Sequence, residues 1–223
     1  IVTTVRAVRE LAPDTRLLHL QTPRSHRLRF LAGQSVTLGL AGSASTAGDD
    51  VQATLPIASC PCDDRNLQFF VPRDHASALA RLLFDGSGGG GGGGGRGGGG
   101  GRGGGSGRAG LRFDGAGRDG QAINLWGPVG DFVLADSPRP LVFAACDTGF
   151  APIRSLIEHA LSLDTAPSLT LYWLATRGDG HFQANQCRAW SAALDAFEYT
   201  PFTHASASAG ARQVAAAIRA DLF

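Results

Sequence analysis

The segment from Pro140 to His159 constrains the fold of this chain more than any other stretch. It reads PLVFAACDTGFAPIRSLIEH. The apolar run 141–145 predicts a buried strand, residues 146–150 predict a tight turn, and an amphipathic helix is predicted from Ala151-Pro152 onward, because proline is tolerated in a first helical turn. Its apolar stripe is Ile153, Leu156, Ile157, Ala160 and Leu161. Since free N–H groups and the helix dipole converge at such a helix start, the segment predicts a phosphate-binding site and a nucleotide binder.

Strand and helix patterns alternate through the rest of the C-terminal part. Strands are predicted at 141–146, 169–175 and 198–204, and helices at 151–163, 184–196 and 210–220. This order is typical of a parallel α/β unit. We expect Trp190, Ala193, Leu194 and Phe197 to form the apolar face of the second helix.

The N-terminal part is dominated by strand signals. Short strands are predicted at 15–20, 34–40 and 66–71, separated by proline and glycine, which favours a small antiparallel β-barrel. A helix is predicted at 75–84, with Asp74 as its N-cap. With a boundary near 136–140, the chain divides into a barrel domain at 1–137 and an α/β domain at 138–223.

A glycine-rich tract interrupts the barrel part. Residues 86–107 contain 18 glycines among 22 residues. A segment with so little to bury is expected to be disordered, so we interpret it as a flexible insertion. Arg96 and Arg102 in this tract, and Arg108 directly after it, recur every six residues, but no aromatic residue accompanies them. RNA binding by this tract is therefore the weakest of the functional hypotheses.

Charge and hydropathy argue against a nucleic-acid-binding or membrane-spanning protein, and the two ends of the chain lead to two further expectations. The formal net charge is +1, which gives no electrostatic case for nucleic acid or membrane as a partner. No apolar run reaches the ~18 residues of a membrane span. The first residues lack the apolar core of a signal peptide, so a cytoplasmic location is expected. There is no methionine, and the last predicted helix has no strand after it, so both ends are expected to be incomplete.

The four cysteines do not form a metal-binding pattern. Cys60 and Cys62 are separated by one proline, and Cys146 and Cys187 are isolated in the sequence. This spacing matches neither a zinc knuckle nor a ferredoxin-type cluster. We expect four reduced structural thiols and no metal site, so any iron–sulfur centre would lie on another chain or on a part outside this sequence.

Five motifs follow one another in a fixed order along most of the chain. They are FLAGQSVTL (30–38), LPIASCP (55–61), WGPVGDFVL (126–134), PLVFAACDTGFAPIRSLIEHAL (140–161) and LTLYWLATR (169–177). Together they resemble the ferredoxin–NADP reductase superfamily, and within it the bacterial reductases akin to CDP-6-deoxy-glucoseen reductase. The resemblance implies an FAD-binding barrel followed by an NAD(P)-binding α/β domain. It further implies a hydride that passes from NAD(P)H to the flavin, and electrons that pass on to an iron–sulfur or other redox protein.

The resemblance also implies the cofactor-binding positions. The strip beside the flavin corresponds to Pro56, Ile57, Ala58 and Ser59, and a helix start beside the flavin pyrophosphate corresponds to Ser77. The nucleotide loop and the adenosine contact correspond to Thr148, Gly149, Ala151, Pro152 and Arg177. No side chain is required as an acid or a base, because the cofactors carry the redox chemistry.

Several positions depart from the motifs of the resemblance. Ala53, Leu55 and Pro56 stand in place of an arginine that pairs with the FAD phosphates, a tyrosine that stacks on the ring, and a serine that bonds near N5. Cys146 and Asp147 replace glycines of the nucleotide loop. The last strand of the family, with its Cys-Gly and terminal aromatic, is not found. These departures support an alternative: a catalytically degenerate subunit that keeps the reductase fold for a structural or partner-binding role in a larger complex.

Overall fold

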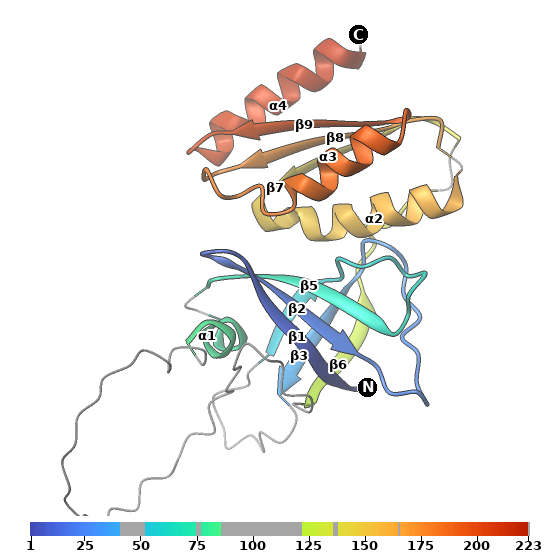
Figure 1. The fold of residues 1–223 in the computed structure, drawn as a ribbon, viewed down its shortest axis with the longest axis vertical. Coiled ribbons are helices and arrows are strands. Elements are labelled where there is room, and N and C mark those ends of the chain that lie inside the picture. Colours follow the sequence, from blue (N-terminus) through green and yellow to red (C-terminus); the bar gives the residue numbers. More distant parts are fainter. Residues whose placement is uncertain (41–51, 75–76, 86–121, 136–137, 165, 223) are drawn as a thin grey trace, which may run out of the picture.

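A computed structural model describes residues 1–40, 52–74, 77–85, 122–135, 138–164 and 166–222. It contains an antiparallel sheet followed by a parallel α/β layer, in the order that the sequence predicted (Figure 1). The predicted glycine-rich insertion at 86–107 lies outside the described residues.

The N-terminal unit is a curved sheet of six strands. These are β1 (Val2–Ala12), β2 (Thr15–Gln21), β3 (Ser35–Leu40), β4 (Gln52–Pro56), β5 (Asn66–Pro72) and β6 (Ala122–Val129), in the spatial order β4-β3-β6-β1-β2-β5. All its strand pairs are antiparallel, and the outer strands β4 and β5 also contact each other, which closes the sheet toward a barrel. Inward-facing side chains such as Leu18, Leu20 and Phe69 form its core.

The helix α1 (Ala78–Asp85) packs on the barrel core through Leu79, Ala80 and Leu83. The sequence predicted its start at residue 75 with Asp74 as the cap, and this prediction is wrong. The hydroxyl of Ser77 accepts a hydrogen bond from the Ala80 N–H at 3.3 Å, so Ser77 caps the helix. Ser77 lies three residues before the N–H donor, Ala80. It therefore makes the capping hydrogen bond that was predicted for Asp74, about one helical turn later in the chain.

The C-terminal unit is a parallel sheet with the order β7-β8-β9. Its elements are β7 (Leu141–Cys146), the short 3₁₀ helix η1 (Asp147–Gly149), α2 (Phe150–Leu163), β8 (Leu169–Ala175), α3 (Ala184–Ala193), β9 (Phe197–Thr203) and α4 (Ala207–Leu222). The predicted second helix is shorter than expected, because Leu194 is extended and Phe197 begins β9. The predicted last helix is longer than expected at both ends. No helix in these described ranges is long and apolar enough to cross a membrane.

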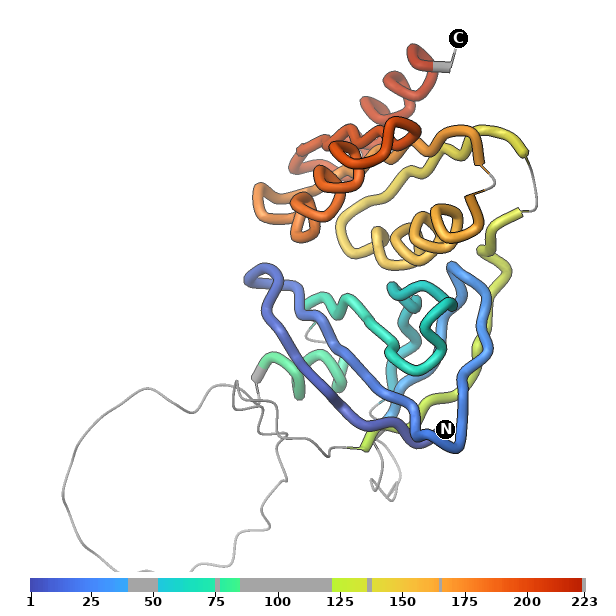
Figure 2. The backbone as a smooth tube through the Cα atoms, turned by 45° about the vertical axis from the view of Figure 1, so that its right-hand side comes forward, coloured from blue at the N-terminus to red at the C-terminus, as the bar shows by residue number. Residues whose placement is uncertain are grey.

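Helix α2 lies between the parallel sheet and the barrel, while α4 covers the opposite face of the sheet (Figures 1 and 2). The buried side of α2 joins both units in one apolar cluster, in which Phe70 and Ala58 of the barrel meet Phe150, Ile157 and other residues of the α/β unit. On the other face, Val214 of α4 packs against Tyr172 and Leu174. The two units therefore share a continuous core at α2.

Candidate nucleotide-binding site at the domain junction

A cleft of about 290 Å³ lies at the carboxyl ends of β7 and β8, where these strands approach the barrel. Open α/β sheets commonly bind ligands at this end of the strands. Both units contribute to its walls: Asp14, Thr15, Pro72 and Arg73 come from the barrel, and Asp147, Thr148, Thr176, Arg177, Gly180 and Phe182 come from the α/β unit.

Asp147 shapes the floor of this cleft. Its φ is 46°, in the left-handed region that favours glycine. The backbone N–H and the hydroxyl of Thr176 both donate to the Asp147 carboxylate, at 2.8 and 2.7 Å, and the Trp173 indole N–H donates to its carbonyl at 3.2 Å. These contacts hold a non-glycine residue in the loop, and they direct its carboxylate toward the end of β8.

The start of α2 leaves room beside Thr148. Gly149 has helical backbone angles, and a Cβ built on it would meet no atom within 4 Å. The fold itself therefore does not require glycine at this position, and the open space allows a ligand to approach the first turn of α2. Ala151 is fully buried, so it serves the core, and Pro152 lies half-buried in the first turn.

Arginines bring positive charge to the cleft from both units. Arg177 pairs with Asp14 across the junction and, at 3.6 Å, with Asp179 of its own loop. The other oxygen of Asp14 lies 3.9 Å from Arg73 Nε. The Asp14 carboxylate thus lies between two arginines, in the position that a phosphate group of a ligand could take.

Of the residues that line this cleft, the sequence identified Thr148 and Arg177, but not Asp14, Arg73 or Thr176. The predicted Gly149 follows Thr148 in the chain but is not a lining residue. Asp14 and Arg73 belong to barrel turns far away in the sequence, and no local pattern connects them with the nucleotide loop. Thr176 directly precedes Arg177 at the end of β8, so its place after a buried parallel strand was a usable signal.

Two free cysteines are described, and neither has an activated thiol. Burial raises the pKa of the Cys187 thiol to about 12, and burial together with the Asp147 charge raises the pKa of Cys146. A thiol with a raised pKa is a poor nucleophile. The expectation of structural thiols fits these two residues.

The strip predicted to lie beside a flavin has no charged side chain, whereas the cleft is lined by arginines. Ala53 and Leu55 pack against the barrel core. The N–H groups of Ile57 and Ala58 donate to the carbonyls of Gln34 and Gln68, at 3.0 and 2.8 Å. The strip therefore offers a flavin neither a cation nor an aromatic ring, and both of these N–H groups already have acceptors. The arginine and the tyrosine that the resemblance implies for FAD have no counterpart in this strip, so a flavin held here would lack both contacts.

The other predicted flavin positions serve contacts within the protein. Ser59 Oγ accepts a hydrogen bond from the Gln68 N–H at 3.3 Å, and Pro56 is half-buried at the end of β4. Ser77 lies apart from this strip as the cap of α1. The structure thus places residues 57–59 next to α2 but does not bring Ser77 to them.

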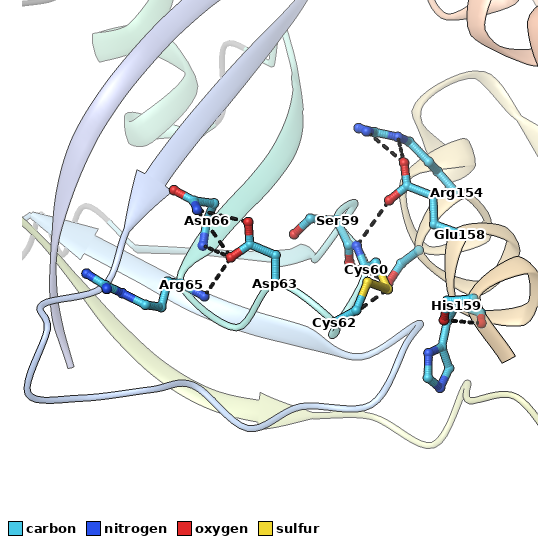
Figure 3. Close-up of a disulfide and its surroundings, with 11 residues drawn as sticks. Ser59, Cys60, Cys62, Asp63, Arg65, Asn66, Arg154, Glu158 and His159 are labelled. Carbon is cyan, nitrogen blue, oxygen red and sulfur yellow. Dashed lines mark hydrogen bonds and ion pairs between the residues drawn. A yellow bond between two sulfur atoms is a disulfide. The ribbon is translucent and has the colours of Figure 1, made fainter.

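The segment after β4 fastens the barrel to α2 (Figure 3). The buried Ser155 hydroxyl donates to the Ser59 carbonyl at 2.7 Å, and the Cys60 N–H donates to the Glu158 carboxylate at 3.1 Å. Arg154 pairs with Glu158 at 2.8 Å and donates to Gln68 Oε1, also at 2.8 Å. Polar contacts therefore surround the apolar cluster at the junction.

Ser155→Ala is expected to lower the free energy of unfolding by about 1–3 kcal/mol, because the buried Ser59 carbonyl would lose its donor. Ser162→Ala is the matched control: the exposed Ser162 hydroxyl donates to the His159 carbonyl within α2, and water can replace it. Urea unfolding of both variants measures the difference. Equal stability of the two variants would contradict a role for Ser155 at the junction.

Cys60 and Cys62 correct one expectation. The structure joins them in a disulfide, so the prediction of four reduced thiols is wrong for this pair. The turn at Pro61 brings their Cα atoms to 5.2 Å, within the range that a disulfide spans.

Comparison with known proteins shows which folds this arrangement resembles. No model of a known protein family matches the chain. The chain is 21% identical over 191 residues to the CDP-6-deoxy-L-threo-D-glycero-4-hexulose-3-dehydrase reductase of Yersinia pestis, an alignment that covers 86% of the chain and 46% of that protein. The chain therefore spans about half the length of the curated relatives that it matches.

Solved structures extend the comparison. A ferredoxin NADP+ reductase from Neisseria gonorrhoeae with bound FAD and NADP has a TM-score of 0.62 at 17% identity, covering 93% of the chain and 69% of that protein. Phthalate dioxygenase reductase, described as a modular structure for electron transfer from pyridine nucleotides to [2Fe-2S], has a TM-score of 0.61 at 15% identity, covering 90% of the chain and 51% of that protein. The chain has the fold of the ferredoxin–NADP reductases, and the resemblance and fold class predicted from the motifs are confirmed.

Proposed function

We propose that this protein is a flavin-dependent oxidoreductase that binds NAD(P)H in the junction cleft and passes electrons to an iron–sulfur or other redox protein, with the flavin as the group that would accept the hydride. The observation that carries the proposal is the cleft itself. Two arginines, three threonines and two aspartates line it, and the open start of α2 adjoins it, at the carboxyl ends of parallel strands. The relatives and the solved structures with this fold include reductases, and one of them is described as passing electrons to [2Fe-2S].

Four residues of the cleft would contact the nucleotide. Arg73 and Arg177 would bind phosphate groups of the nucleotide, with Arg177 nearest the adenosine end. The Thr148 hydroxyl would donate to a phosphate or ribose oxygen, while the Thr176 hydroxyl, which already donates to Asp147, would accept from a ribose hydroxyl. NAD(P)H would supply the hydride and the flavin would accept it, so the protein needs only to hold these two groups in place. The division into domains at 1–137 and 138–223, and a cytoplasmic location, are part of the same proposal.

Two substitutions at the cleft test nucleotide binding. Arg177→Ala is expected to weaken ADP binding about 5- to 10-fold, since it removes a charge-assisted hydrogen bond at a partly exposed site. Asp14→Asn is expected to strengthen it about 2- to 5-fold, because the carboxylate that competes with phosphate for Arg177 is removed. Isothermal titration calorimetry with ADP and adenosine 2′,5′-bisphosphate measures both changes.

Asp195→Asn is the control for net charge, because Asp195 is exposed and lines a different cleft, near the start of β9. This variant should bind ADP as the unsubstituted protein does. If Asp14→Asn and Asp195→Asn gave the same affinity, Asp14 would have no part in the nucleotide site. If the unsubstituted protein bound neither ADP nor NAD(P)H, the cleft would not be a nucleotide site.

A second candidate function is a reductase-fold subunit without flavin chemistry, which holds partners in a larger complex. The packing of Ala53 and Leu55 against the barrel core favours it. Titration of the protein with FAD, followed by flavin fluorescence and the visible spectrum, separates the two candidates. Saturable uptake of one FAD supports the oxidoreductase, and no uptake at any FAD concentration supports the subunit. The RNA hypothesis rests on Arg96 and Arg102, which lie outside the described residues.

A further inference from the structure

The turn Cys60-Pro61-Cys62 places a disulfide at the edge of the junction between barrel and α2 (Figure 3). Its two ends differ in environment. Cys60 is 7% exposed and its backbone is fixed, because its N–H donates to Glu158 of α2. Cys62 lies on the exposed side of the turn. One sulfur therefore belongs to a residue that solvent reaches, and the other to a residue packed against the second unit.

This disulfide contributes little to folding compared with most disulfides. The stabilisation that a disulfide provides through chain entropy increases with the length of the loop that it closes. Here the two cysteines are separated by only two positions in the sequence. The junction is already fastened by Ser155 and Glu158, whose hydrogen bonds to Ser59 and Cys60 do not require the disulfide. A contribution to the stability of the fold therefore explains the Cys60–Cys62 disulfide poorly.

A hydrogen bond within the turn favours its opening in one direction. The Cys62 N–H donates to Cys60 Sγ at 3.2 Å. When a disulfide is attacked, one sulfur becomes bonded to the attacking group and the other leaves as a thiolate, and a leaving thiolate of lower pKa departs faster. An N–H donor on Cys60 Sγ stabilises negative charge there. In a thiol–disulfide exchange Cys62 would accordingly be the sulfur that is attacked, and Cys60 would be the leaving group.

We propose that Cys60–Cys62 is a thiol–disulfide exchange site that takes two electrons from an external dithiol, either a small molecule or a protein. The thiolate of the dithiol attacks Cys62 Sγ, the S–S bond breaks, and Cys60 leaves as a thiolate that takes up a proton. The second thiol of the dithiol then attacks the mixed disulfide and releases Cys62 as a thiol. The cysteine pair gains two electrons and two protons, and the dithiol becomes a disulfide. This site does not depend on the proposed nucleotide binding.

The direction of the exchange is tested with two single variants. Both carry Cys146→Ser, because Cys146 is an exposed free thiol that would also react. Cys60→Ser leaves the exposed Cys62 thiol, and Cys62→Ser leaves the buried Cys60 thiol. On incubation with glutathione disulfide, mass spectrometry of the intact folded proteins should show an adduct in Cys60→Ser that forms at least about 10-fold faster than in Cys62→Ser. Equal rates would overturn the proposed direction.

The Cys146→Ser protein with both Cys60 and Cys62 tests the exchange itself, and it does not depend on how the single variants fold. After oxidation with glutathione disulfide, alkylation in denaturant should label one thiol, Cys187, and after treatment of the folded protein with dithiothreitol it should label three. Failure to form the disulfide would overturn the proposal. So would a disulfide that dithiothreitol reduces only in the presence of denaturant, because such a bond is closed to external thiols.

Discussion

Phe70→Ala is expected to lower the free energy of unfolding by about 3–5 kcal/mol, the range for removing a buried phenylalanine side chain. Phe70 is 2% exposed and belongs to β5 of the barrel, yet its ring points to the α/β unit. It stacks with Phe150 at a centroid distance of 6.3 Å and meets the edge of Phe182 at 5.0 Å. Phe150 in turn stacks on Trp173 at 4.1 Å. The substitution would therefore leave a cavity at the centre of the contact between the two units.

Phe69→Ala is the matched control, because Phe69 is the preceding residue of β5 and is also buried, but it faces the barrel core. Both variants should be destabilised in urea unfolding. Acrylamide quenching of tryptophan fluorescence distinguishes them: Phe70→Ala should expose Trp173 to the quencher, and Phe69→Ala should leave it shielded. A Phe70→Ala protein that lost less than about 1 kcal/mol, with unchanged quenching, would show that the two units do not share this core.

Gly33→Ala is expected to lower the free energy of unfolding by about 3–5 kcal/mol, as the sum of backbone strain and overpacking. Gly33 has φ +93°, and a Cβ at this position would lie 2.0 Å from the Phe132 carbonyl oxygen and 3.3 Å from Leu156 Cδ2. The carbonyl oxygen is part of the backbone, so it cannot rotate away as the end of a flexible side chain would. Gly33 sits where the barrel, the segment after β6 and α2 converge, and its substitution would push these three apart.

Gly130→Ala separates the two contributions. Gly130 has φ +105°, but a Cβ there would meet nothing within 4 Å, so only the strain term of about 1–2 kcal/mol applies. Thermal unfolding followed by circular dichroism would measure both variants. If the two substitutions cost the same, the close contact with Phe132 would be absent in solution.

The junction cleft, the cap of α1 and the disulfide show how far sequence motifs can predict the structure around a site. Thr148 and Arg177, two of the predicted site residues, lie in the cleft at the carboxyl ends of the strands, because each closely follows its strand in the sequence. That they bind a nucleotide stays a prediction. The cap of α1 was predicted at the wrong residue, because both Asp74 and Ser77 have cap-forming side chains and only the path of the chain decides between them. The disulfide was missed because the spacing of two cysteines does not show whether their side chains meet.

Local patterns in the sequence were enough to predict the class of fold. Alternation of period two in the first part, and buried strands alternating with amphipathic helices in the second, are local patterns that each segment carries alone. The tertiary structure decided what joins the two units. Arg177 and Asp14 are separated by 163 positions, and Ser155 and Ser59 by 96. No periodicity connects residues so far apart, and neighbours such as Phe69 and Phe70 are both apolar although they face different cores. Such contacts arise only when the barrel and the α/β unit pack against each other, because packing then fixes which side chains can meet.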